Sequence, residues 1–231
     1  MNKLSRSSAT ISWNLIDVVA VFVIAFLPFV LLAILTQTKD HYPLTYLWNI
    51  LRLIAPIVLV IGVRKGKVGD LGLIPGDKPE RCIWIGVATS IILLTFHFFT
   101  IGAPLLEPIS KCHVSLKGIL ASIFSVFGKH GFLIVILIPL SEELFYRGFL
   151  YPAFKKRWGI VWGVIISSAI FSLAHFDSFT LGVLLDRFLK GVVFACLYER
   201  YKTLIPSLAA HSTNNFIGNS IAMLLYFNKA S

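Results

Sequence analysis

The chain has 231 residues, of which 57% are hydrophobic and 14% are charged, and its mean hydropathy is +0.82. This composition excludes a soluble globular domain and indicates an integral membrane protein. Lysine and arginine outnumber aspartate and glutamate by 21 to 11, and most of these charges lie between apolar runs. We therefore attribute the basic surplus to membrane topology and not to nucleic-acid binding.

Seven apolar stretches are long enough to cross a membrane, since a spanning helix needs about 20 mostly apolar residues. They cover residues 11–36, 44–63, 82–103, 131–151, 158–176, 179–198 and 203–226. A shorter stretch, 114–127, fits an interfacial helix, a re-entrant segment or an eighth span. We expect an all-α membrane protein, a bundle of seven or eight transmembrane helices with a polar intramembrane site.

The sixth apolar stretch differs from the others because three charges interrupt it. Asp186, Arg187 and Lys190 lie inside residues 179–198. Charges inside a membrane helix usually face other helices or water. They predict a break in this helix or a side that faces water.

Basic residues are concentrated in alternate connecting segments. They precede the first stretch and follow the second, fourth and sixth, at Lys3 and Arg6, within residues 64–81, at residues 155–157, and at Arg200 and Lys202. The opposite connections carry fewer, namely Lys39, Lys111, Lys117 and Lys129. Because cytoplasmic loops are enriched in lysine and arginine, this pattern places the N-terminus in the cytoplasm.

Two carboxylates and a guanidinium interrupt the fourth apolar stretch, at Glu142, Glu143 and Arg147. A charge at the centre of a membrane helix costs about 2.5–3.5 kcal/mol on insertion scales, so three of them need a reason. Glu143 and Arg147 are at i,i+4 and are expected to pair on one side of the helix. Glu142 points about 100° away and has no partner in its own helix, which makes it the carboxylate free for chemistry.

Two later stretches supply imidazoles and a carboxamide. Phe171 and His175 lie one helical turn apart, and so do His211 and Asn215. With Glu142, these residues could deprotonate a water molecule and stabilise an oxyanion at a scissile carbonyl, which predicts peptide hydrolysis. A glutamate and two histidines are also a catalytic zinc set, so zinc bound by Glu142, His175 and His211 stays open as an alternative.

The motifs Glu142-Glu143-x-x-x-Arg147, Phe171-x-x-x-His175 and His211-x-x-x-Asn215 follow one another on successive apolar stretches. In this order they resemble the motifs of the CAAX protease and bacteriocin-processing family, also called the Abi family, which includes the type II CAAX prenyl endopeptidases. The resemblance covers residues 131–226. It implies a CAAX-protease-like catalytic core there and N-terminal transmembrane spans with their connections in residues 1–130, within one membrane domain.

The resemblance also implies a role for each residue of the motifs. Glu142 and His175 would activate the attacking water, and His211 and Asn215 would bind the oxyanion. Glu143, Arg147 and Phe171 would support the site. We expect no metal cofactor, because an asparagine at the fourth position suits an oxyanion donor better than a zinc ligand; zinc is the alternative.

The expected protein is thus an intramembrane endopeptidase of a prokaryotic cell membrane. Its implied partners are the lipid bilayer and a peptide or protein substrate, membrane-bound or prenylated, with no nucleic acid. The implied roles are CAAX-type maturation of proteins or peptides, or bacteriocin self-immunity. Two other classes compete: a proton- or ion-coupled transporter, because intramembrane Glu, His and Arg also mark proton relays, and a non-catalytic immunity or scaffold protein.

Depth sets a condition on this site. At about 1.5 Å per residue, Glu142 lies roughly 20 Å from the basic group at Lys155, His175 about 27 Å from Arg157, and His211 about 14 Å from Lys202. Straight helices would hold them at different depths. We expect tilt, staggered ends or a break in a helix, with Pro139 or Gly148 as the place of the break.

Overall fold

The computed structural model describes residues 11–36, 42–100, 116–126, 128, 131–175 and 180–229. This part of the chain is helical and contains no strand, which confirms the all-α prediction. Its α-helices are α1 (Leu15–Thr36), α2 (Tyr42–Ile57), α3 (Pro79–Thr100), α5 (Leu116–Val126), α6 (Ile138–Glu142), α7 (Tyr151–Leu173), α8 (Leu181–Tyr201) and α9 (Ile205–Lys229). The π-helices are η1 (Val58–Val63), η3 (Leu133–Leu137) and η4 (Glu143–Leu150), and η2 (Val68–Leu71) is a 3₁₀ turn.

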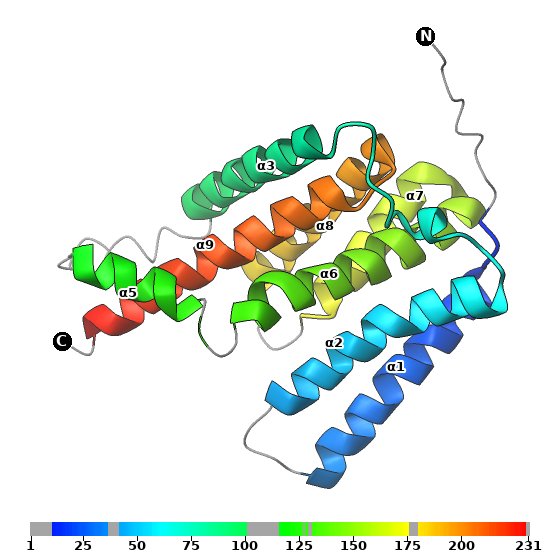
Figure 1. Cartoon of the computed structure of the whole chain (residues 1–231), viewed down its shortest axis with the longest axis horizontal. Helices are drawn as coiled ribbons and strands as arrows, with labels where there is room; N and C mark the ends of the chain where they lie inside the picture. Colours follow the sequence, from blue (N-terminus) through cyan, green and yellow to red (C-terminus); the bar gives the residue numbers. More distant parts are fainter. Residues whose placement is uncertain are drawn as a thin grey trace.

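The helices form a bundle around α9 (Figure 1). Helix α3 packs along one side of α9, and α8 and α6 also contact it. Helices α1 and α2 form a pair that packs on the bundle mainly where α2 meets α6 and η4. This arrangement places α6 between α2 and α9, so that residues of α6 contact both of these helices.

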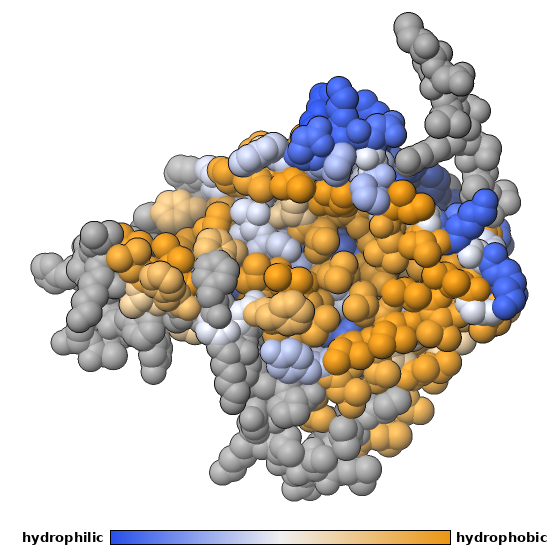
Figure 2. All heavy atoms as spheres, in the orientation of Figure 1, coloured by the Kyte–Doolittle hydropathy of each residue, from blue (hydrophilic) through white to orange (hydrophobic). Residues whose placement is uncertain are grey.

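Two of the described helical segments, Leu44–Val63 and Pro79–Phe98, are long and apolar enough to cross a membrane. The other apolar stretches coincide with helices, and their crossing of the membrane stays a prediction. Figure 2 shows hydrophobic residues over most of the described surface in view. Trp84 and Ile92 of α3, for example, are 70% and 69% exposed, as expected of side chains that face lipid.

Helix α5 bears on whether residues 114–127 form an eighth transmembrane span. Its 11 residues cover about 16 Å, which is short of the roughly 30 Å of hydrocarbon. It packs against α9 (Figure 1). As far as the structure describes it, this segment is too short to be an eighth span.

Helix α8 is continuous from Leu181 to Tyr201, so the predicted break is wrong. Asp186 and Lys190 are buried, so they do not form a water-facing side, whereas Arg187 is partly exposed. Asp186 pairs with Lys190 of its own helix, at 2.8 Å, and with His97 of α3, at 3.0 Å. The burial of Asp186 and Lys190 is tolerated because these two charges neutralise each other.

The break expected at Pro139 or Gly148 lies instead at Gly159, where φ is 84° and ψ is 175°. A Cβ atom on Gly163 would lie 3.0 Å from the backbone nitrogen of Lys155, so the chain folds back on itself after Gly159. Only glycine adopts such a φ readily. Gly148 serves a different purpose, because a Cβ there would clash with the carbonyl oxygen of Leu71.

This reversal resolves the depth condition. Glu142 lies 17 residues before Gly159 and His175 lies 16 residues after it, so the two arms bring both to a similar level. Tyr151 and Lys155 both bond to Glu199, near the end of α8. The estimate of depth had assumed that residues 155–157 form a loop at the membrane surface. They lie within a helix, so distances counted from them do not give the depth of Glu142 or His175.

Part of the charge pattern behind the topology prediction cannot be placed. Lys3, Arg6, Lys39, Lys111 and Lys129 lie outside the described residues, and so do residues 101–103 of the third stretch. The orientation of the N-terminus stays a prediction.

Candidate active site

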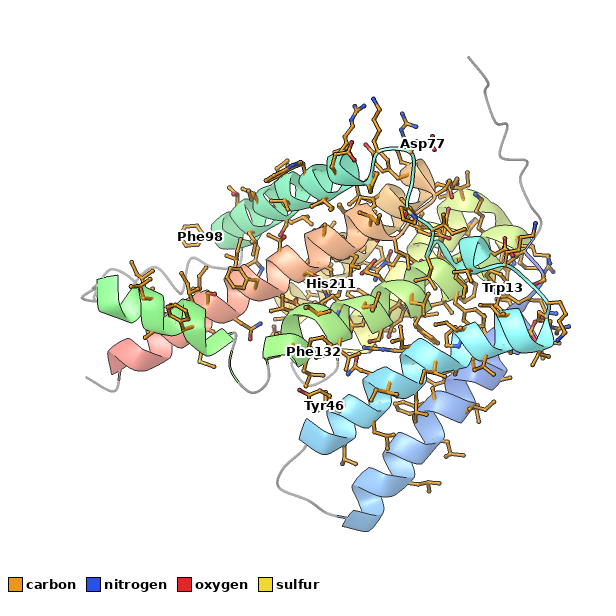
Figure 3. The ribbon with its side chains drawn as sticks, viewed as in Figure 1. Trp13, Tyr46, Asp77, Phe98, Phe132 and His211 are labelled. Carbon is orange, nitrogen blue, oxygen red and sulfur yellow. The ribbon has the colours of Figure 1, made fainter. Side chains whose placement is uncertain are left out.

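Three of the four predicted catalytic residues converge in the structure. Glu142 is the last residue of α6, His175 follows α7, and His211 projects from α9 toward α6 (Figure 3). Glu142 Oε2 lies 3.6 Å from His211 Nε2 and 4.0 Å from His175 Nε2. The side chains of Glu142 and His211 are 7% and 4% exposed, whereas that of His175 is 24% exposed. His175 is therefore on the open side of the cluster.

The hydrogen bonds of the two imidazoles determine which ring nitrogen faces Glu142. His175 Nδ1 lies 2.8 Å from the carbonyl oxygen of Phe171, which can only accept, so this nitrogen carries a proton. His211 Nδ1 lies 2.9 Å from Glu143 Oε1, a carboxylate oxygen that accepts in the same way. When either ring is neutral, its Nε2 thus presents a lone pair toward Glu142.

The predicted pair of Glu143 and Arg147 is present, with 3.0 Å between Oε1 and Nη1, and both side chains are almost fully buried. The Arg147 guanidinium lies over the ring of Phe171, 4.3 Å from its centroid. The same ring is 4.9 Å from that of His175 and 6.0 Å from that of His211. Phe171 and Arg147 therefore form a packed support behind the two imidazoles.

Glu142 is not without an ionic partner, and this corrects the sequence interpretation. Arg52 of α2 places Nη2 3.0 Å from Glu142 Oε1. Asn49 and Ser141 bond to the same guanidinium. Periodicity within one helix could not reveal a partner 90 residues away, but Asn49 and Arg52 are polar residues inside the second apolar stretch, and that was the available signal.

Asn215 is held apart from the other three. It lies one turn beyond His211, and its Nδ2 donates to the carbonyl oxygen of Ile134, at 3.0 Å. In the π-helical register of η3 this carbonyl would bond to the amide of residue 139, which is Pro139 and has no amide hydrogen. No hydrogen bond within the described residues joins Asn215 to Glu142 or to either histidine.

Oε2 of Glu142 is buried and has no hydrogen-bond partner. Oε2 of Glu143 shares this property, but the Glu142 oxygen is the one that two imidazole nitrogens face. The gaps of 3.6 and 4.0 Å are too long for direct hydrogen bonds, yet one water molecule can lie within bonding distance of both partners. Three acceptor atoms that converge in this way need a proton donor or a cation between them.

Zinc is the alternative occupant of this cluster. Ligands of one tetrahedral zinc ion lie about 3.4 Å apart, less than the distances from Glu142 Oε2 to either imidazole. No group of three or more His, Cys, Asp or Glu side chains in the described parts of the chain is arranged to hold a metal ion.

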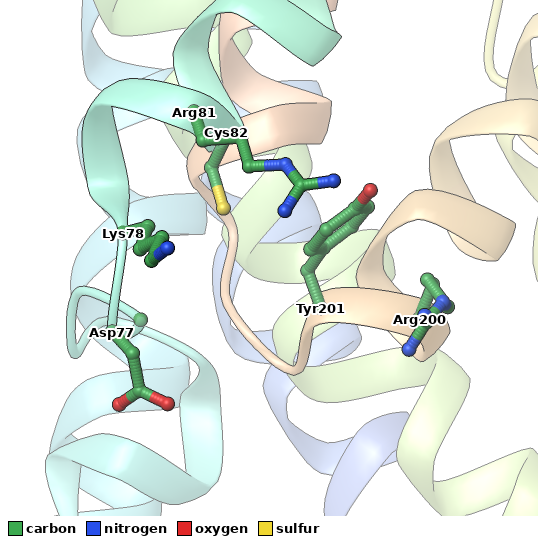
Figure 4. Close-up of a pocket in the computed structure, with 7 residues that line it drawn as sticks. Asp77, Lys78, Arg81, Cys82, Arg200 and Tyr201 are labelled. Atoms are coloured by element: carbon green, nitrogen blue, oxygen red, sulfur yellow. The ribbon is translucent and has the colours of Figure 1, made fainter.

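A separate cavity of about 290 Å³ lies between the start of α3 and the end of α8 (Figure 4). It is lined by Gly76, Asp77, Lys78, Arg81, Cys82, Arg200 and Tyr201. None of the predicted site residues is among them. The cavity brings together two of the basic groups that were predicted to share one side of the membrane.

A family model described as type II CAAX prenyl endopeptidase Rce1-like matches residues 93–217. This range contains all seven predicted site residues but not Arg52. No solved structure matches the chain.

Curated relatives match shorter parts. The UPF0177 protein YbdJ of Lactococcus lactis subsp. lactis (strain IL1403) is 30% identical over 136 residues, which are 59% of this chain and 57% of YbdJ. The UPF0177 protein YxdF of the same strain is 29% identical over 94 residues, 41% of this chain and 50% of YxdF. An Escherichia coli protein named "Uncharacterized 24.3 kDa protein" is 31% identical over 87 residues, 37% of this chain and 40% of its own. The chain spans about half the length of the curated relatives it matches.

Proposed function

Because the chain belongs to the type II CAAX prenyl endopeptidase Rce1-like family, we propose that it is an intramembrane endopeptidase whose water nucleophile is activated by Glu142 and His175. One observation carries this proposal. Glu142 Oε2 is buried without a hydrogen-bond partner, and Nε2 of His211 and of His175 face it at 3.6 and 4.0 Å.

The proposed reaction begins with a water molecule between Glu142 and His175. The water donates one hydrogen to Glu142 Oε2 and the other to His175 Nε2, which leaves an oxygen lone pair for attack on the scissile carbonyl carbon. As the new C–O bond forms, one of these two bases takes the proton from the water. When the C–N bond breaks, the same proton passes to the leaving amine.

The negative charge that develops on the carbonyl oxygen needs donors. We assign this role to His211 and Asn215. To donate through Nε2, His211 enters the reaction as an imidazolium that has taken its second proton from solvent, and Glu143 Oε1 is placed to accept the hydrogen on Nδ1. Asn215 has two hydrogens on Nδ2 and uses one for Ile134, so the second is available to the oxyanion.

The substrate we propose is a peptide or a membrane-bound protein, prenylated or not, that reaches the site from the side of His175. The proposed setting is a multi-pass protein of a prokaryotic cell membrane with a cytoplasmic N-terminus. Residues 131–226 would carry the catalytic core. Peptide maturation of the CAAX type and bacteriocin self-immunity are both consistent with such an activity.

The test is peptide cleavage by the purified protein in liposomes, with products identified by mass spectrometry and with prenylated and unprenylated peptides compared. We expect Glu142→Gln to lower kcat by about 10²–10⁴-fold, the usual contribution of a general base. Glu80→Gln, at an exposed carboxylate in the first turn of α3, should leave the rate unchanged. Wild-type cleavage by a folded Glu142→Gln protein contradicts the mechanism, and proton flux without cleavage of any peptide favours a transporter.

A chelator separates the two routes to an activated water. We expect cleavage to continue in the chelator, because Glu142 and His175 suffice as bases. Loss of activity that zinc restores would contradict this route and support the zinc alternative.

A further inference from the structure

The carboxylate of Glu142 is held on one side by a buried network that begins on α2. Arg52 Nη2 lies 2.9 Å from Ser141 Oγ and 3.0 Å from Glu142 Oε1. It also lies 2.5 Å from Asn49 Oδ1, which in turn accepts from Ser141 Oγ at 2.6 Å. The guanidinium packs over the ring of Trp48, 5.4 Å from its centroid. These contacts fix Arg52 in place independently of any substrate.

This geometry divides the two oxygens of Glu142 between two tasks. Oε1 is bonded to Arg52, so the carboxylate cannot rotate freely about its last torsion. Oε2 is thereby held toward the Nε2 atoms of His175 and His211. A base has to keep within a few tenths of an ångström of its productive position, and a fixed guanidinium provides this.

Charge leads to the same conclusion. The buried cluster contains two carboxylates, Glu142 and Glu143, and two guanidiniums, Arg52 and Arg147, so it is neutral when both imidazoles are neutral. A buried carboxylate without a cation tends to take up a proton instead of staying charged. A protonated Glu142 could not accept a proton from water.

We propose that Arg52 is a positioning residue that holds the Glu142 carboxylate through Oε1 and aims its free oxygen at the water site. The inference rests on the proposed function and adds to it a residue from α2, outside the segment of residues 93–217 that the family model matches. The catalytic unit is thus completed by a helix whose only sequence signal is two polar residues in an apolar run, Asn49 and Arg52.

A matched control exists in the same part of the chain. Arg64 pairs with Asp17, with 2.6 Å between Nη2 and Oδ1, and this pair ties α1 to the segment after η1. It has the same chemistry as the pair of Arg52 and Glu142 but lies away from the two imidazoles. Arg64→Gln therefore removes an arginine–carboxylate pair without touching the site.

The activity test compares Arg52→Gln, Arg52→Lys and Arg64→Gln by peptide cleavage in liposomes. We expect Arg52→Gln to lower kcat by about 100-fold with KM unchanged, because the base is misplaced while substrate binding is intact. Arg52→Lys should recover part of the lost kcat, since it restores the charge but not the fork of donors. Arg64→Gln should keep the wild-type kcat.

A second measurement is independent of cleavage. Thermal unfolding in detergent should show that Arg52→Gln lowers the unfolding temperature and that Glu142→Gln in the same protein partly restores it, because no unpaired buried charge then remains.

Wild-type kcat in a folded Arg52→Gln protein overturns the inference while leaving the proposed function intact. So does an Arg52→Lys protein that is no better than Arg52→Gln, or an unfolding temperature that shows no coupling between the two residues. Full cleavage by Glu142→Gln instead contradicts the proposed function, and the role of Arg52 falls with it.

Discussion

Two buried clusters in this molecule combine a carboxylate, a cation and histidine, and they differ in how the carboxylate oxygens are used. Asp186 has both oxygens paired, Oδ1 with His97 at 3.0 Å and Oδ2 with Lys190 at 2.8 Å. Glu142 has only Oε1 paired, with Arg52, while Oε2 faces two imidazoles without bonding to either. Residue types alone do not separate the two clusters.

The difference shows what distinguishes a structural ion pair from a candidate reactive one. Around Asp186 the charges satisfy one another, and what they provide is an attachment between α3 and α8. Around Glu142 one acceptor atom is left over, beside the partly exposed imidazole of His175. Variants of the Glu142 cluster should therefore lose cleavage rate, whereas variants of the Asp186 cluster should lose stability and keep their cleavage rate.

The largest contrast should come from the histidines. We expect His175→Ala to lower the rate of peptide cleavage by about 10²–10⁴-fold, because it removes a base next to the water. His97→Ala should leave the rate unchanged, since Asp186 keeps Lys190 as its partner. Equal losses in the two variants, measured on the same peptide, would contradict the distinction between the clusters.

Stability should reveal the structural cluster. Lys190→Met removes the lysine that pairs with buried Asp186 and should lower the free energy of unfolding by about 3–5 kcal/mol. Adding Asp186→Leu should restore most of this loss, because an apolar pair replaces an ionic one, and cleavage should persist. The measurement is unfolding in detergent for both variants, and a double variant no more stable than Lys190→Met contradicts the expectation.

Asn215 should combine both kinds of effect. Asn215→Ala removes a proposed oxyanion donor, and kcat should fall by about 10²–10³-fold. It also leaves the carbonyl of Ile134 without its donor, which should cost about 1–3 kcal/mol of stability. Asn214→Ala is the control, because it removes the side chain of the neighbouring buried asparagine, which has no proposed catalytic role. If Asn215→Ala destabilises the protein but cleaves at the wild-type rate, the residue is structural only.

The smallest effect on stability is expected at Glu199, which lies beyond the predicted span 179–198 in a cluster whose charges are partly exposed to solvent. Burial alone would raise the pKa of Glu199, but hydrogen bonds from Lys155, Lys202 and Tyr151 outweigh it and lower the pKa below the usual 4.5. A lowered pKa stabilises the fold above pH 4.5, and this contribution is lost as the pH falls through the folded-state value.

We therefore expect Glu199→Gln to lower the free energy of unfolding at pH 7 by only about 0.2–1 kcal/mol, because the cluster is partly exposed. The variant should also lose less stability than the wild type between pH 7 and pH 3. Unfolding in detergent at several pH values measures both, and identical acid profiles in the two proteins contradict the assignment.

Most of the helical layout could be predicted from the sequence, because long apolar runs leave few alternatives to helices. The reversal at Gly159 could not, since a glycine between Trp158 and Ile160 looks like any other in an apolar helix. Pro139 was the stronger breaker by residue type. The π-helical register around it absorbs its missing amide with the help of Asn215, so the helix continues.

The site was predictable where its contacts are local. Glu143 and Arg147 could be paired from their spacing, and the same spacing placed His211 and Asn215 on one face. Arg52 could not be assigned to Glu142, because nothing within one helix indicates which distant helix lies across from it. The depth of His175 likewise depended on where the chain turns back.

The π-helical register of η3 sets the direction in which the later side chains of this helical segment point. A π-helical turn holds about one residue more than an α-helical one, and one residue more or less turns every later side chain by about 100°. Ile134, inside η3, is attached to α9 through Asn215, and Glu142 faces α9 again at His211. The number of residues between these two attachments is therefore a property of the site: a relative with the same motif letters but a one-residue gap in this segment would point a different side chain at the imidazole.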